Sequence, residues 1–258
     1  MTDLNRLPRP VLEQMANAGR MARASMDALA QRGSSVVSEA LKDADGFFEW
    51  RHYPETDVYD PVSHAQFYYH AHPPGERAAV EHGHFHTFLR PRGMPPGVRP
   101  LVLPELAIAD APAQPATPVL PPAAQPNQGE DNDKPSHLVA IAMDAHGRPI
   151  RLFTTNRWVT GETWYAAADA VRMLDRFRVD VPGPAPLVSR WITAMFILFR
   201  PEMADLLIAR DARIMSWRRR HRGKVHVFED RRLDVAASID IDLDDHLSRV
   251  ETAFRRAA

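Results

Sequence analysis

The chain has 258 residues, of which 45% are hydrophobic and 25% charged, and its formal net charge is −1. These values are typical of an ordinary soluble globular protein and give no electrostatic case for binding nucleic acid or an anionic membrane. The absence of cysteine excludes disulfides, thiolate metal ligands and cysteine nucleophiles, so that nitrogen and oxygen donors must hold any metal.

The first ten residues contain no apolar stretch of the kind that a secretory signal requires. The longest strongly apolar run, residues 191–199, has about half of the roughly 20 residues that span a bilayer. We therefore expect a cytoplasmic protein without a membrane segment. Arginine supplies nearly all of the basic residues, and alanine and proline are abundant, which predicts a bacterial source with a GC-rich genome.

Residues 1–44 are predicted to form an N-terminal helical segment. Apolar side chains recur at roughly helical spacing, and the stretch 33–35 (Gly-Ser-Ser) indicates a break before a second helix. Residues 47–53 then favour a short strand, and residues 54–61 have turn-forming residues at both ends.

Two segments, residues 63–72 and 81–90, alternate with the period of two that a strand requires. In the first segment, apolar side chains point one way while His70 and His72 point the other way. We predict two antiparallel strands, joined by residues 73–80, whose apolar faces pack on helices. The opposite face is then polar and lined by histidine.

Residues 91–135 differ in composition from the rest of the chain. They contain twelve prolines in 45 residues, many alanines and an acidic run at 129–133. This composition cannot form a packed core and predicts a disordered Pro/Ala-rich insertion. Its most apolar part, residues 100–109, is a candidate for docking on the domain. A proline-rich segment that binds a partner protein remains the alternative.

Regular patterns resume after the insertion and, with residues 45–90, predict a single α+β domain over 45–90 and 136–258. Its mainly antiparallel sheet packs helices on one face. The predicted strands span 137–144, 150–158 and 233–241. The predicted helices run from Thr160 or Thr163 as N-cap to Phe177, over 187–199, from Pro201 to about Arg220, and from Asp242 onward. Core positions at helical spacing are Trp191, Met195, Phe196, Phe199 and Trp217.

Five histidines lie within seventeen residues, at positions 70, 72, 82, 84 and 86. Because side chains at i and i+2 of a strand share a face, two neighbouring strands bring His70 and His72 close to His84 and His86. Imidazole is the commonest metal ligand near neutral pH. These four residues are therefore the predicted ligands of a divalent transition metal: Fe, Mn, Ni or Zn.

A polar strand face also carries histidines without any metal. On that interpretation the rings splay into solvent, whereas a metal or ligand site requires them to converge within a few Å. Further candidate ligands are Glu76, Glu81 and His137. The histidines expected to be structural or exposed are His52, His64, His146, His221, His226 and His246.

A second group of polar residues lies at the end of the strand predicted at 150–158. Arg157 can bind a carboxylate or phosphate through two hydrogen bonds, and Glu162 can act as a base, so both are candidate catalytic residues near a substrate. The alternative is a strand-to-helix turn in which Glu162 lies in the first helical turn and favours the helix dipole.

One basic cluster stands out in the second half of the chain, and it consists of Arg210, Arg213, Arg218, Arg219, Arg220, Arg222 and Lys224. Such a cluster can contact nucleic-acid phosphates. However, cations at a helix C-terminus are favourable without any partner, acidic residues lie nearby, and no nucleic-acid-binding motif is present. Nucleic acid is therefore not the expected partner.

Three stretches resemble a bacterial family of unknown function: residues 57–72 (DVYDPVSHAQFYYHAH), residues 81–90 (EHGHFHTFLR) and residues 152–164 (LFTTNRWVTGETW). The resemblance covers most of residues 45–240 outside the proline-rich insertion. It implies a bacterial, cytoplasmic protein, and it implies no activity.

Three functions are compatible with these observations. The first is a metal-dependent enzyme that acts on a small molecule through the histidine cluster. The second is a non-catalytic module that binds a small ligand, a metal or haem on the same face. The third is an interaction protein whose histidines are incidental. Only an enzyme additionally requires an open coordination position, or a pocket that Arg157 and Glu162 line.

Overall fold

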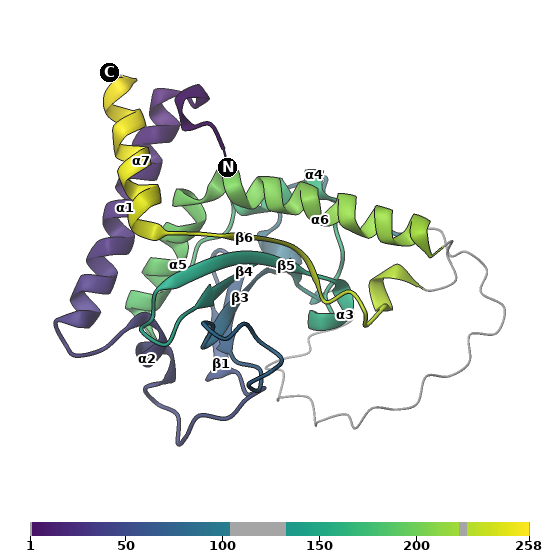
Figure 1. Cartoon of the computed structure of the whole chain (residues 1–258), viewed down its shortest axis with the longest axis horizontal. Coiled ribbons are helices and arrows are strands. Elements are labelled where there is room, and N and C mark those ends of the chain that lie inside the picture. The colour runs from purple at the N-terminus through teal and green to yellow at the C-terminus, as the bar shows by residue number, and fades with distance from the viewer. Residues whose placement is uncertain (1, 104–132, 222–225, 258) are drawn as a thin grey trace.

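Antiparallel strands joined in chain order form the central sheet of the computed structural model, which describes residues 2–103, 133–221 and 226–257 (Figure 1). The order across the sheet is β1-β2-β3-β4-β5-β6, so that every strand pairs with its neighbours in sequence. The strands are β1 Tyr53–Tyr59, β2 Ala65–His70, β3 Gly83–Leu89, β4 Ser136–Met143, β5 Pro149–Thr155 and β6 Val235–Asp240.

Most of the helices pack on one face of this sheet, and the predicted α+β class is confirmed. The helices are α1 Arg9–Ala30, α2 Val36–Leu41, α3 Arg157–Thr160, α4 Ala167–Leu174, α5 Pro186–Leu198, α6 Arg200–Arg220 and α7 Leu243–Arg256. The first and last, α1 and α7, lie side by side, α1 also packs on α5, and α6 crosses β4, β5 and β6 (Figure 1). Of the helices in the described ranges, none has the length and apolar character needed to cross a membrane.

The sheet face toward the helices is the apolar face that the alternating pattern predicts. Phe67, Phe85, Ile141 and Leu152 are fully buried there, in one hydrophobic core with the helices. The Phe85 ring lies 5.8 Å from the ring of Trp191 on α5. Burial of each such side chain stabilises the fold by about 1.5–3 kcal/mol. This burial fixes the strand register, and the register in turn determines which side chains lie on the opposite face.

The opposite face, which was predicted to be polar and lined by histidine, is buried as well. A small separate cluster of Ala140, Ala142 and Phe153 lies on it. His84 and His86 beside this cluster are only 5% and 1% exposed. Alternation alone distinguishes the two faces but does not reveal what covers each of them.

The first strand departs from the sequence prediction. Residues 47–52 lie outside any strand, and β1 instead begins at Tyr53 and runs through the segment predicted as a turn. Pro54 is compatible with this because β1 is an edge strand, where a residue without an N–H group costs little pairing.

The helix predicted to begin at Thr160 or Thr163 begins at Ala167 instead. Ala166 precedes it without a side-chain cap, and a carboxylate oxygen of Asp211 on α6 accepts from the Ala167 N–H at 2.6 Å. The cap therefore comes from a distant helix. Residues 157–160 form the separate short helix α3, which ends at Gly161 with a φ of 63°.

Residues 91–103, predicted as the start of the insertion, contact the domain. A short 3-10 helix, η2 Pro91–Gly93, follows β3. The Leu101 N–H donates to the Trp164 carbonyl at 2.8 Å, and Leu101 and Leu103 pack against a second apolar cluster. The docking expected of residues 100–109 is thus seen as far as residue 103. The disorder predicted for residues 104–132 concerns positions outside the described residues.

The predicted basic cluster does not form one surface. Arg210 is 1% exposed, and its guanidinium lies 4.0 Å from the centre of the Trp164 ring and donates to the Tyr165 carbonyl at 2.6 Å. Arg210 therefore stabilises the packing of the interior and is not available to a partner at the surface. Residues 218–220 lie in the last turn of α6, where their charge complements the helix dipole. Residues 222 and 224 lie outside the described ranges.

Candidate metal centre

Strand pairing places the predicted histidines on one face. His70 lies directly opposite His84 in the β2–β3 register, and Tyr68 lies opposite His86. Residues directly opposite on one face of an antiparallel pair have neighbouring side chains. The backbone thus brings His70 and His84 together, while His72 reaches them from the loop that follows β2.

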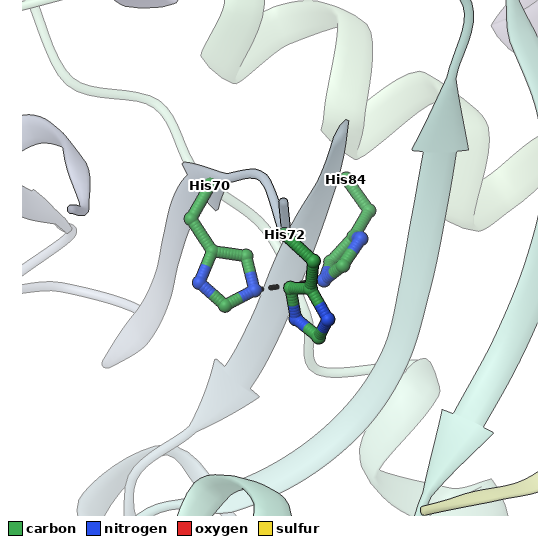
Figure 2. A group of neighbouring side chains, drawn as sticks. All are labelled: His70, His72 and His84. Carbon is green, nitrogen blue, oxygen red and sulfur yellow. Dashed lines mark hydrogen bonds between the residues drawn. The ribbon is translucent and has the colours of Figure 1, made fainter. Parts of the chain in front are cut away.

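The imidazoles of His70, His72 and His84 converge, and these three residues are called the triad below. One nitrogen each from His70, His72 and His84 lies within 4.8 Å of the other two, and the Nε2 atoms of His70 and His84 are 2.8 Å apart (Figure 2). Two nitrogens bound to one tetrahedral Zn²⁺ at 2.0–2.1 Å lie about 3.4 Å apart. The His70 and His84 nitrogens must therefore move apart by about 0.6 Å, and the His72 ring must turn toward them, for the three nitrogens to bind one ion.

A buried carboxylate orients one of these rings. The Nδ1 atom of His84 lies 2.8 Å from Oε1 of Glu81, whose other oxygen pairs with Arg151. A carboxylate accepts, so His84 carries its proton on Nδ1 and presents the Nε2 lone pair to the site. The carboxylate–histidine–metal arrangement is the usual way in which proteins fix a ligating imidazole.

Burial keeps two rings of the triad neutral. It lowers the pKa of His70 well below its ordinary value, and with His84 it lowers the pKa of His72 to about 4. Burial acts to raise the pKa of Glu81, but the hydrogen bond and charge of His84 and the charge of Arg151 outweigh it and lower that pKa. Neutral imidazoles beside an ionised carboxylate are the protonation states that a metal ion requires.

His86, the fourth predicted ligand, is paired differently from the other three. Its ring lies 5.0 Å from the His70 ring, but its Nδ1 atom faces Nε2 of His137 at 2.9 Å. Nδ1 of His137 in turn lies 3.4 Å from the Thr155 hydroxyl. His86 therefore belongs to a hydrogen-bonded chain behind the triad, and its nitrogens are not among the three that converge.

Two residues of the loop between α2 and β1 cover the cluster, and neither was predicted to belong to the site. The Trp50 ring lies 4.2 Å from the His72 ring, and its backbone φ of 69° falls in the left-handed region that a tryptophan rarely adopts. The His52 ring stacks on Tyr68 at 3.5 Å and is held by Asp57 at 3.0 Å. Such backbone strain is typical of functional sites.

A pocket of about 310 Å³ opens onto the triad. Its lining includes His72 and His84 together with Phe153 and Thr155. This volume lies at the lower limit of small-molecule sites. Two of the three histidines, His72 and His84, are therefore accessible from the pocket. This access can supply the open position that separates a catalytic metal site from a structural one.

The structure places Arg157 and Glu162, the predicted catalytic residues, in a different pocket of about 490 Å³. The Arg157 guanidinium pairs with Glu229. Glu162 is 5% exposed and accepts from the His137 N–H at 2.5 Å. Neither residue lines the pocket at the triad. The alternative for Glu162, a first-turn position on the next helix, is wrong because α4 begins only at Ala167.

These observations define an α+β protein with a buried histidine cluster that can hold a metal ion. The chain belongs to the family described as Domain of unknown function (DUF6969), whose model matches residues 16–241. The match confirms the resemblance to a family of unknown function and extends it to α1. The chain has no match among the curated proteins, and no solved structure matches it either.

We expect the substitution Glu81→Gln to lower metal affinity about 10–100-fold, because the amide still fills the space but loses the charge that orients His84. Competition with a chelating dye measures this affinity. Glu76→Gln, which removes an exposed carboxylate from the same pocket, should leave the affinity nearly unchanged. An equal loss of metal affinity in both variants would show that Glu81 acts only through its negative charge and not by orienting His84.

Proposed function

We propose that the protein is a metal-dependent enzyme acting on a small molecule, with His70, His72 and His84 as its three protein ligands. The observation that carries the proposal is the convergence of three imidazoles, two of which, His72 and His84, line a pocket. Catalytic zinc sites characteristically combine three protein ligands with one open position.

The donor set fits a first-row transition metal. Three imidazole nitrogens suit Zn, Fe, Ni and Cu and are a poor match for Mg or Ca, which prefer oxygen. Fe, Ni and Zn are therefore the leading candidate ions. Mn prefers oxygen ligands, so it is a candidate only with additional oxygen donors on the open side of the site. A metal held there supplies a Lewis acid that polarises an oxygen of the substrate or activates water.

The chain itself supplies orientation and shielding. Glu81 fixes the tautomer of His84, and Arg151 holds Glu81 in place. Trp50 covers the outer side of His72, and Phe153 packs edge-on against His84 at 5.1 Å between ring centres. These contacts reduce the access of water to the two rings, which strengthens electrostatic interactions within the site.

The test is elemental analysis of untagged protein purified without chelator, followed by removal of the metal and reconstitution with each candidate ion. We expect close to one ion per chain. Protein that retains no ion under any of these conditions would contradict the metal proposal and leave a histidine-lined ligand site or an interaction surface.

Addition of azide to the Co²⁺-loaded protein separates an enzyme from a closed binding module. An open coordination position accepts the anion, and the visible absorption of Co²⁺ then changes. We expect such a change. A spectrum that stays constant at saturating azide would indicate a closed site and overturn the catalytic part of the proposal.

Metal binding should quench the fluorescence of Trp50, because its ring lies 4.2 Å from that of His72 and paramagnetic ions such as Co²⁺ or Ni²⁺ quench only nearby fluorophores. The chain has five tryptophans, so Trp50→Phe identifies the responding residue. We expect this variant to bind metal and to lose the quenching. Trp217→Phe, a change on α6, should retain it, and the reverse pattern would contradict the placement of Trp50 over the site.

A further inference from the structure

The pocket at the triad carries an arginine without an acidic partner. Arg77, on the loop between β2 and β3, lines the pocket together with His72 and His84. Its guanidinium donates to the backbone carbonyl of His82, and it takes part in no ion pair among residues 2–103, 133–221 and 226–257. Four of its five N–H groups are therefore not committed to that carbonyl.

The second arginine of the pocket is already engaged. Arg151 pairs with Glu81 and lies 5.1 Å from the centre of the Phe153 ring. The two remaining acidic residues of the pocket, Glu76 and Asp234, are exposed, so water screens their charges. A divalent ion on the three histidines then leaves the pocket with a net positive charge.

One wall of the pocket is apolar. Phe153, Val159 and Val235 line it, in the same pocket as His72 and His84. The volume of about 310 Å³ holds about ten non-hydrogen atoms at the packing of liquid water, near 30 Å³ each. The pocket therefore suits a compact molecule with one anionic end and a short carbon skeleton.

We infer that this pocket binds a small monocarboxylate, whose carboxylate group is held by Arg77 and whose carbon skeleton lies along Phe153 and Val159. A planar guanidinium matches a carboxylate with two parallel hydrogen bonds. This inference rests on the proposed metal site, which places the reactive end of the ligand near His72 and His84. A phosphate would share the same arginine, but the apolar wall favours an organic acid.

Calorimetric titration with butyrate, benzoate, butyramide and inorganic phosphate tests the inference on the metal-free and the Zn²⁺-loaded chain. We expect both carboxylates to bind, with higher affinity to the loaded protein, and the neutral butyramide not to bind. Equal binding of butyramide and butyrate would overturn the inference, and so would binding of phosphate without binding of either carboxylate.

Variants of Arg77 identify the contact. Arg77→Gln should weaken butyrate binding at least tenfold with the metal content unchanged, and Arg77→Lys should recover part of the loss because it restores the charge without the planar fork. Glu76→Gln is the matched control, and it should bind butyrate at least as tightly as the native chain. Unchanged binding in Arg77→Gln would overturn the assignment.

The two proposals fail separately. A chain that binds Zn²⁺ but neither carboxylate retains the metal proposal and overturns the ligand class. A chain that binds no metal, yet binds butyrate through Arg77, retains the carboxylate pocket and overturns the metal proposal.

Discussion

The double substitution His70→Ala/His84→Ala should abolish stoichiometric metal binding, because it removes two of the three converging nitrogens and the 2.8 Å contact between them. A single remaining imidazole cannot hold a divalent ion against water in the pocket. Elemental analysis after dialysis measures the loss, and circular dichroism checks that the variant is folded.

The matched control removes two histidines remote from the triad. His146 is exposed in the turn between β4 and β5, and His221 contacts Trp217 at the end of α6. His146→Ala/His221→Ala should retain one ion per chain. Because His70 and His84 are buried, His72→Ala at the half-buried rim serves as a second test that spares the core. Full metal content in His72→Ala and in the double triad variant would contradict the site.

Sequence periodicity predicted the part of the site that strand pairing creates. His70 and His84 belong to segments that alternate cleanly, and the apolar residues between them fix which face each strand turns to the helices. The contact between these two imidazoles therefore followed from the pattern. The hydrogen bond of His84 to Glu81, three residues earlier, also depends only on local chain geometry.

Other contacts of the site depend on structural irregularities that the alternation of the sequence does not indicate. A bulge shifts the β3–β4 register, so that His86 pairs with Ala140 while Phe88 pairs with His137. The extra residue turns His137 to the same face as Ala140, three positions away, which strict alternation forbids. Only the three-dimensional structure reveals that His86 uses its Nδ1 atom on His137.

Loops explain the remaining differences. Trp50 and His52 reach the cluster from a segment whose composition favoured a strand, and no local pattern indicates that they fold over β2. Arg157 was predicted at the end of a strand but begins α3, and its guanidinium pairs with Glu229. A polar residue at a strand end is thus a weak indicator of which pocket its side chain enters.

The substitution Glu162→Gln should stabilise the protein strongly in alkaline solution. Glu162 is 5% exposed, and within the described part of the chain its Oε1 atom has no hydrogen-bond partner. Burial raises its pKa from 4.5 to about 8, although the charge of Arg210 and the hydrogen bond from the His137 N–H act in the opposite direction.

The sign of the pH dependence follows from this shift. Between pH 4.5 and about 8 the folded chain keeps the carboxyl protonated while the unfolded chain ionises it, so the free energy of unfolding falls as the pH rises. The full shift corresponds to a loss on the order of 3–5 kcal/mol. The neutral amide introduced by Glu162→Gln avoids this loss and can still accept from the His137 N–H.

Denaturant unfolding at about pH 5 and about pH 8.5 measures the effect. We expect the native chain and Glu162→Gln to differ little at the lower pH, and the variant to be more stable by several kcal/mol at the higher pH. Glu229→Gln, an exposed glutamate of the same pocket, is the control and should change stability little at either pH. A parallel loss of stability in the native chain and in Glu162→Gln between the two pH values would contradict this prediction. The ionisation of Glu162 would then not cause the loss, and Arg210 would compensate the charge of the carboxylate in the folded protein.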